Sequence, residues 1–425
     1  MKYQRFFGIL FFILCFAYAF NSGVLKTDGA KHIDGRYIYI AGTCWLTGQS
    51  PYNFDTFSRV WQKEMKNEKE VWQQQLKQGR GAFVYPPTMG VIAIPIALFS
   101  WDIAKYVLDF MNLLFLLLIA FFSGGIIKKT LNLTSYDGKI WAGMGLACLI
   151  SAVQWTIFIG QTPLIALAGC LGAIYFFQRS NIIIASLFIV VASIKPQLSL
   201  LPVIYLFIMA RNWSFFGWSS VFVAVTTMSI LVLGGDYNPF SIIQGSTTTH
   251  LSLTQFEASR LSGLFWFMDQ IGINHPVTFI SPVAGLMLVS ALVFWLRKKD
   301  LGVFDNFGNG EDKSKMQTLL FLTLPFCMTP IFMPLHGYDY VVFFLVFSSL
   351  IVMRGYFIAL LLPGIILVAR PSNVANLINF MIDGHVTNFY VSRMLESIGA
   401  IYLTITIVIM AIFVIDVQIN HSTKD

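Results

Sequence analysis

A series of long apolar runs, recurring from one end of the chain almost to the other, constrains this sequence more than any other feature. A helix needs about 20 mostly apolar residues to cross the hydrocarbon core of a bilayer. Hydrophobic residues make up 56% of the chain and charged residues 12%, which is about half the charged fraction of a soluble domain. No intervening polar segment is long enough to form its own core. The sequence therefore predicts an all-α, polytopic membrane protein, with residues 1–425 forming one integral membrane domain.

The apolar runs predict about 12 transmembrane helices, with a range of roughly 11 to 13. If both termini are cytoplasmic, one candidate segment does not cross completely. Either 181–211 is a single broken span, or one of 88–100 and 102–127 fails to cross. The remaining predicted segments are 139–159, 162–178, 215–234, 276–297, 316–333, 337–353, 355–370 and 395–418.

The first apolar run, Phe6 to Phe20, follows the cations Lys2 and Arg5. Ala17-Tyr18-Ala19 resembles a cleavage site, so a signal peptide is one interpretation. A retained first helix with a cytoplasmic amino terminus fits the membrane-embedded remainder better. The polar segments then become a first outer loop at 26–85, a second outer loop at 235–275 and a cytoplasmic loop at 298–315.

The formal net charge is +7. Cations that flank membrane segments and set their orientation account for this charge, and no basic patch interleaved with aromatic residues indicates nucleic-acid binding. The five cysteines form no metal-type pair and no disulfide framework, so we predict neither a metal site nor disulfides from them.

The first outer loop contains apolar residues at helical spacing: Phe57, Trp61, Met65, Trp72 and Leu76. Charged residues occupy the other faces, which predicts one or two amphipathic helices lying in the membrane interface. Such helices could simply cover the membrane domain, or they could cover a groove that holds a lipid substrate.

Lys195 is an ionisable residue inside an apolar run, and such residues indicate function by default. Pro196 follows it and interrupts the helix, which frees backbone groups. A lysine beside a helix break can bind an anion such as phosphate. The alternative is a lysine at a helix end whose side chain extends to the interface.

Three further polar residues stand out. Gln161, in Gly160-Gln161-Thr162-Pro163, could be a helix cap or a contact for a sugar hydroxyl. His336 opens His336-Gly337-Tyr338-Asp339-Tyr340 and could be structural or functional. Asp34 lies just beyond the first span. The sequence contains no nucleotide-binding, metalloprotease or serine-hydrolase motif in a plausible context, which argues against a soluble nucleotide-sugar or ATP site.

Together these motifs resemble the membrane glycosyltransferases of the GT-C class, and more narrowly glycosyltransferase family 87, the polyprenyl-phosphate-mannose-dependent mannosyltransferases. The resemblance extends from about residue 34 to 350. It rests on these stretches in their order: Asp34 with Tyr37 and Tyr39, Gly48-Gln49-Ser50-Pro51-Tyr52, Tyr85-Pro86-Pro87 with Pro95, Gly160-Gln161, Lys195-Pro196, Arg211-Asn212-Trp213, Ser259 to Gly263, and Thr329-Pro330 with His336. The chain departs from the family pattern at Met333-Pro334-Leu335.

The resemblance implies an enzyme that moves a hexose, expected to be mannose, from a polyprenyl-phosphate donor to a lipid or glycan acceptor, with inversion. Asp34 would be the general base. Lys195, with Arg36 or Arg260, would stabilise the leaving phosphate, and His336 and Gln161 would contact donor phosphate or sugar. Tyr85, Trp61 and Trp72 would border the groove for the lipid tail.

The resemblance also implies an integral protein of a bacterial inner or plasma membrane, with the active site facing outward and membrane lipids around it. Two other function classes remain at this point: a secondary transporter or lipid flippase, and a non-catalytic partner in envelope assembly. The long polar loop after the first span argues against a transporter, and Asp34 argues against a non-catalytic protein. Acceptor identity, sugar identity, a divalent metal requirement and oligomeric state stay open.

Overall fold

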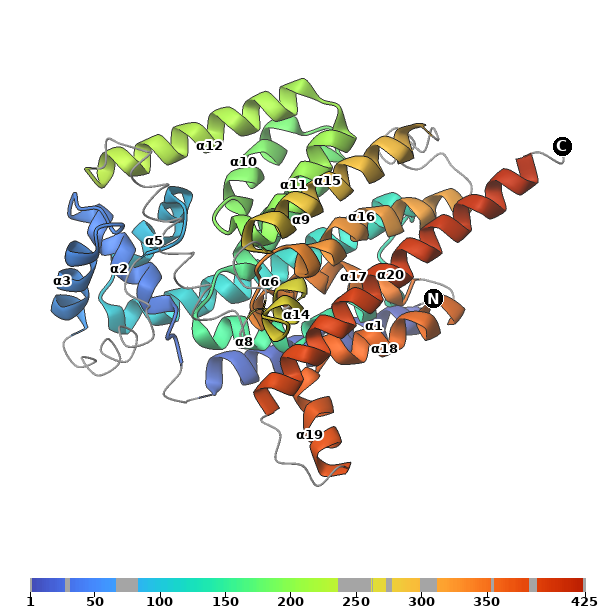
Figure 1. Cartoon of the computed structure of the whole chain (residues 1–425), viewed down its shortest axis with the longest axis horizontal. Coiled ribbons are helices and arrows are strands. Elements are labelled where there is room, and N and C mark those ends of the chain that lie inside the picture. The colour runs from blue at the N-terminus through green and yellow to red at the C-terminus, as the bar shows by residue number, and fades with distance from the viewer. Residues whose placement is uncertain are drawn as a thin grey trace.

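The structure is a computed structural model of the whole chain, and every regular element in its described residues is a helix (Figure 1). This confirms the predicted all-α class. The described residues are 2–26, 31–65, 83–235, 261, 263–272, 277–298, 312–352, 355–381 and 388–422.

Most of the helices coincide with predicted apolar runs, but the helices at 35–46, 264–270 and 371–381 lie outside those runs. The first part of the chain forms α1 (Lys2–Phe20), η1 (Asn21–Leu25), α2 (Gly35–Leu46), α3 (Phe54–Glu64), η3 (Pro87–Met89), α5 (Gly90–Ala97), α6 (Trp101–Thr130), α7 (Gly138–Cys148) and α8 (Ser151–Ile159). The middle part forms α9 (Pro163–Phe177), α10 (Ile182–Ala192), α11 (Pro196–Ala210), α12 (Trp213–Leu233), α14 (Leu264–Gln270) and α15 (Val277–Lys298). The last part forms α16 (Asp312–Phe332), η5 (Gly337–Phe343), α17 (Phe344–Leu350), α18 (Gly355–Ala369), α19 (Pro371–Met381) and α20 (Asn388–Ser422).

Several of these helices can cross a membrane, so the chain is a membrane protein. Within the described residues, four helical stretches are long and apolar enough, namely Tyr3–Leu25, Trp101–Thr130, Trp213–Leu233 and Val391–Ala411. The number rises to six if α7 with α8, bent by 54°, and α18 with α19, bent by 86°, each count as one span. The expected number of about 12 spans is not confirmed, because breaks in the runs leave several apolar helices of only 10–17 residues.

The break predicted at Lys195-Pro196 is present. Helix α10 ends at Ala192, and α11 begins at Pro196. Proline is suited to the first position of a helix because its missing N–H needs no partner there. The run 181–211 is therefore two short helices with Lys195 at the junction between them.

The segment predicted to be the first outer loop contains one amphipathic helix, α3. In α3, Phe57 and Trp61 are buried, and Met65 follows them on the same face. Asn53 caps this helix by accepting a hydrogen bond from the Thr56 N–H. Residues 66–82, which include Trp72 and Leu76, lie outside the described residues.

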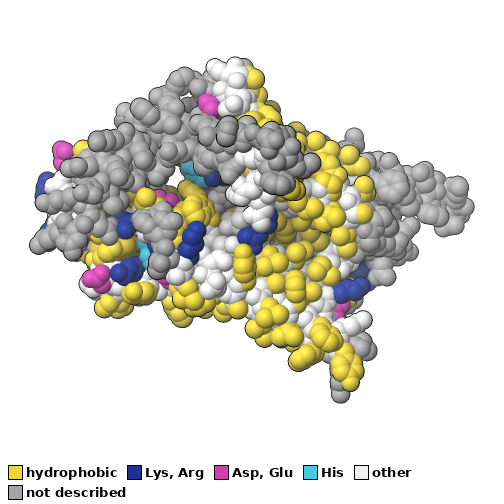
Figure 2. Space-filling view, turned by 90° about the horizontal axis from the view of Figure 1, so that it is seen from below, with side chains coloured by type: hydrophobic (Ala, Val, Ile, Leu, Met, Phe, Trp, Pro, Cys, Tyr) yellow, Lys and Arg dark blue, Asp and Glu magenta, His cyan; other side chains and the backbone are white. Residues whose placement is uncertain are grey.

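Close helix packing holds the first helix in the bundle. A Cβ added at Gly8 in α1 would clash with the Gly138 carbonyl oxygen in α7. Small residues let helix backbones approach in this way within a membrane. Figure 2 shows hydrophobic side chains covering a broad part of one face, with Lys and Arg side chains gathered elsewhere on it. In Figure 1 both termini lie at one end of the molecule, while α2 and α3 lie at the other.

This arrangement gives a topology prediction. We expect Ser58→Cys, in α3, to react with a membrane-impermeant maleimide in intact cells, and Ser314→Cys, at the start of α16, to react only after lysis. The five native cysteines are all buried and unbridged, so their background labelling should be low. Labelling of Ser314→Cys but not Ser58→Cys in intact cells would reverse the predicted orientation.

Candidate active site

A chain of hydrogen bonds joins four polar side chains from distant parts of the sequence. The Tyr52 hydroxyl donates to the Tyr85 carbonyl oxygen at 2.8 Å. The Tyr85 hydroxyl donates to Gln161 Oε1 at 2.9 Å. Gln161 Nε2 then donates to Asp34 Oδ2 at 2.9 Å. The structure thus brings together three predicted site residues, Asp34, Gln161 and Tyr85.

The backbone around Asp34 is fixed against the end of α8. The His32 N–H donates to the Phe158 carbonyl at 2.9 Å, and the Asp34 N–H donates to the Ile159 carbonyl at 3.1 Å. Helix α8 ends at Gly160, whose φ of 72° is in the left-handed region that glycine adopts without a steric penalty. Gly35 packs so closely on Gly160 that a Cβ on Gly160 would come within 3.2 Å of the Gly35 Cα.

The hydrogen bonds of Gln161 determine which end of its amide group faces Asp34. Because its oxygen already accepts from the Tyr85 hydroxyl, its NH₂ group is the end that faces Asp34. An amide donor at this position orients the carboxylate and leaves it able to accept a proton. Asp34 is half-buried at the start of α2, beyond the end of the first helix, as the sequence predicted.

A second polar group lies at the α10–α11 junction. Lys195 Nζ is 2.6 Å from Asp339 Oδ1, and their side chains are only 1% and 0% exposed. Lys195 Nζ also lies 4.7 Å from the centre of the Tyr338 ring, which stacks on His336 with a centroid distance of 5.1 Å. Lys195 is therefore held inside the protein by a buried counter-ion and does not extend to the interface.

The two polar groups contact the same turn of α8. The Thr156 hydroxyl donates to the Tyr338 carbonyl at 2.9 Å, while the Ile159 carbonyl accepts from the Asp34 N–H. Three residues of an α-helix span about 4.5 Å along its axis. Helix α8 thereby contacts both the turn that carries Asp34 and the turn that carries Tyr338.

The other predicted site residues have different surroundings. Arg36 is buried, lies 5.8 Å above the Trp101 ring and donates to the Lys31 carbonyl. Trp61 is buried with its ring centre 5.0 Å from that of Tyr37, so its ring packs inside the loop. Arg260 and Trp72 lie outside the described residues.

The sequence reasoning missed a buried charged cluster beside Asp34. Asp109 of α6 is 2.8 Å from His32 Nε2 and 3.6 Å from Lys31 Nζ. His32 has a φ of 56°, an uncommon conformation for a residue with a side chain, and it lies two positions before Asp34. An aspartate within the apolar run 102–127 was the signal that could have identified this cluster.

The described residues contain no group of three or more His, Cys, Asp or Glu side chains arranged to hold a metal ion. Lys31, His32 and Asp109 instead form an internal charge network. Its position next to the turn at residues 31–34 indicates that it helps to fix this turn.

The buried Lys195–Asp339 pair gives a stability prediction. Lys195→Met leaves the Asp339 carboxylate buried without its counter-charge, and breaking a buried pair in this way costs about 3–5 kcal/mol. We expect a lower midpoint of thermal unfolding for the purified protein in detergent. The double variant Lys195→Met/Asp339→Asn should recover most of the loss, because it buries no uncompensated charge. A double variant as unstable as the single one would contradict this interpretation of the pair.

Comparison with known proteins gives one match. Residues 83–305 match the sequence model of Glycosyltransferase family 87, and this range is just over half of the chain. No curated protein and no solved structure matches the chain. The matched range contains Tyr85, Gln161 and Lys195, and Asp34 joins it through the hydrogen bond to Gln161. The chain therefore belongs to glycosyltransferase family 87.

Proposed function

We propose that this glycosyltransferase moves a hexose, with mannose as the first candidate, from a polyprenyl-phosphate donor to an acceptor hydroxyl on the non-cytoplasmic side of the membrane. The observation that supports this most is Asp34, a carboxylate oriented by the amide of Gln161. Membership of a glycosyltransferase family argues against the transporter and flippase alternatives. Asp34 and its hydrogen-bond chain argue against a protein that has lost activity.

In the proposed reaction, Asp34 is the general base. The acceptor oxygen attacks the anomeric carbon of the donor sugar and forms the new glycosidic bond. The bond from that carbon to the phosphate oxygen breaks, and polyprenyl phosphate leaves with the electron pair. The acceptor proton moves to the Asp34 carboxylate, and attack opposite the leaving group inverts the anomeric centre. Positioned general bases contribute about a hundred- to ten-thousandfold to such reactions.

The leaving phosphate needs hydrogen-bond donors and positive charge. Lys195 carries three N–H donors, and its Nζ is paired with Asp339 Oδ1. His336, next to Tyr338 in the same cluster, would supply another donor. We assign donor-phosphate binding to Lys195 and His336, with Arg36 and Arg260 as further candidates. Tyr85, Trp61 and Trp72 remain candidates for the border of the lipid groove.

The sharpest test of this function is Asp34→Asn. Asparagine has nearly the same shape but cannot accept the acceptor proton, so transfer should fall about a hundred- to ten-thousandfold. The measurement is release of polyprenyl phosphate from a radiolabelled polyprenyl-phosphate mannose, with purified protein and a membrane lipid extract as the acceptor source. Binding of the donor should remain close to that of the wild type.

Asp55→Asn is the matched control. Asp55 is an exposed carboxylate in the first turn of α3, in the same outer loop, and its loss should leave transfer unchanged. If Asp34→Asn kept wild-type turnover, Asp34 would not be the base. If the wild-type protein released no polyprenyl phosphate from this donor, the proposed donor would be wrong.

The double variant Lys195→Met/Asp339→Asn tests the phosphate site separately from folding. Loss of one group that stabilises transition-state charge typically costs about 2.7–4 kcal/mol, so we expect turnover to fall on the order of a hundredfold or more. The assay is the same release of polyprenyl phosphate, compared at matched thermal stability. Wild-type turnover in a stable double variant would place the phosphate site elsewhere.

A further inference from the structure

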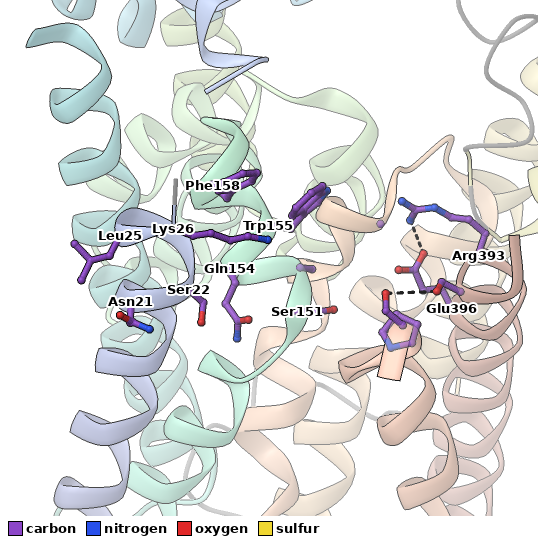
Figure 3. A pocket seen from close by; sticks show the side chains of 15 residues that line it. Asn21, Ser22, Leu25, Lys26, Ser151, Gln154, Trp155, Phe158, Arg393 and Glu396 are labelled. Carbon is purple, nitrogen blue, oxygen red and sulfur yellow. Dashed lines mark hydrogen bonds and ion pairs between the residues drawn. The ribbon is translucent and has the colours of Figure 1, made fainter. Parts of the chain in front are cut away.

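A cavity of about 780 Å³ opens beside the candidate active site, against the outer end of the first helix (Figure 3). Its walls come from η1, α8, the start of η5, α19 and the start of α20. Its size is within the roughly 300–1,000 Å³ typical of small-molecule sites. None of the residues assigned to the proposed reaction lines it, and that reaction still has no binding site assigned to the acceptor.

The aromatic part of the cavity wall comes from one face of α8. Trp155 and Phe158 lie nearly parallel, with ring centroids 5.2 Å apart and an interplanar angle of 21°. Trp155 is 42% exposed, whereas Phe158 is 1% exposed, so Trp155 is the accessible ring of this pair. Lys26 Nζ lies 5.2 Å from the Phe158 ring centre. A flat aromatic surface beside polar groups suits the C–H face of a sugar ring, which is apolar while its rim is polar.

Gln154 carries the strongest indication of a ligand. It lines the cavity, is 8% exposed, and its Oε1 accepts from Arg370 Nη1 at 3.2 Å. Its Nε2 is buried and has no acceptor among the described residues. Since Arg370 can only donate, the amide cannot rotate to exchange its ends. A buried donor left unmatched costs about 1–3 kcal/mol. Nε2 is covered in this structure, and a small movement of the Gln154 side chain toward the cavity would let a ligand hydroxyl oxygen accept from it.

The cavity wall carries charges of both signs, from Lys26, Arg393 and Glu396. Arg393 is paired with Glu396, and both residues line the wall opposite Trp155 (Figure 3). A carboxylate in the wall would repel a phosphate group. An ion pair and an amide together offer both donors and acceptors, which matches a ligand rich in hydroxyl groups.

The cavity also has the right position for the acceptor. Phe158 contributes its ring to the cavity, and its carbonyl accepts from His32, two residues before Asp34. Gly337 lines the other side, directly between His336 and Tyr338, and a Cβ there would overlap Arg393. The turn at residues 32–34 therefore contacts a lining residue of the cavity, and the turn that carries His336 and Tyr338 contributes Gly337 to the wall.

The surroundings of the cavity fit a membrane-anchored ligand. The lining residue Leu25 is 58% exposed and ends the span that begins at Tyr3. Helix α19 bends by 86° from α18, and its Leu377 is 59% exposed. An amphipathic helix at such an angle is typical of the membrane interface.

We propose that this cavity binds the acceptor through a neutral, hydroxyl-rich sugar headgroup, stacked on Trp155 and held by Gln154. Identifying the ligand as the acceptor rests on the proposed function. The binding site itself is independent of the donor and of turnover. The ligand chemistry is that of a glycoside, which a membrane glycolipid or a free glycan could supply.

The test is photolabelling of the full chain in phospholipid nanodiscs, without any sugar donor. The probe is an alkyl β-glucoside with a diazirine in its headgroup linker. We expect crosslinks on the peptide that contains residues 151–158. Trp155→Ala and Gln154→Met should each weaken labelling about tenfold, equivalent to about 1.4 kcal/mol. Trp218→Ala is the matched control, because Trp218 is similarly exposed, at 46%, on α12.

Competitors and a second variant separate the outcomes. If octyl glucoside competes far better than methyl glucoside, the ligand is a glycolipid. If the two compete equally per molecule, the ligand is a free glycan. Both results support a sugar site. Equal labelling by a phosphocholine probe, labelling elsewhere, or labelling unchanged in both cavity variants overturns the proposal. Asp34→Asn should keep full labelling, so a failed transfer reaction and a failed acceptor site give different results. Thermal unfolding confirms that each variant is folded.

Discussion

The structure depends on the requirement that the charged side chains at its centre, inside an apolar helix bundle, find partners within the protein. Without water in the hydrocarbon region, an unmatched donor or charge costs several kcal/mol. The pairs Lys195–Asp339 and His32–Asp109 meet this requirement between elements far apart in the chain. The same requirement orders the chain from Tyr52 through Tyr85 and Gln161 to Asp34. The candidate active site is thus built from contacts that also hold the fold together.

Helix α8 has the central place in this arrangement. Its last carbonyls hold the turn that carries Asp34, and its Thr156 holds the turn that carries Tyr338. It also supplies Trp155 and Phe158 to the cavity wall, of which Trp155 is exposed. The bend of 54° between α7 and α8 turns this short helix away from the direction of the preceding one. A single short element therefore contacts the proposed base, the proposed phosphate-binding turn and the proposed acceptor cavity.

Much of the site could be predicted from local sequence because its signals are local. A lysine beside a proline in an apolar run marks a helix break, and α10 and α11 separate there. The order of the motifs indicated the family that the comparison of residues 83–305 then identified. Asp109 was missed because one carboxylate in a long apolar helix gives no sign of which distant residue it meets. The predicted span count was not confirmed for a related reason: hydropathy measures apolar length, and proline or polar breaks divide that length into shorter helices among the described residues.

The sequence by itself determined the helical class, the membrane environment, the break at Lys195 and the position of Asp34 after the first helix. These follow from composition and from the spacing of residues along a few turns. Only the tertiary structure decided that Lys195 faces Asp339, that Gln161 presents its NH₂ group to Asp34, and that Gln154 has an unmatched donor in a cavity. Those contacts join residues up to more than a hundred positions apart, and only the packing of the helices brings them within hydrogen-bonding distance.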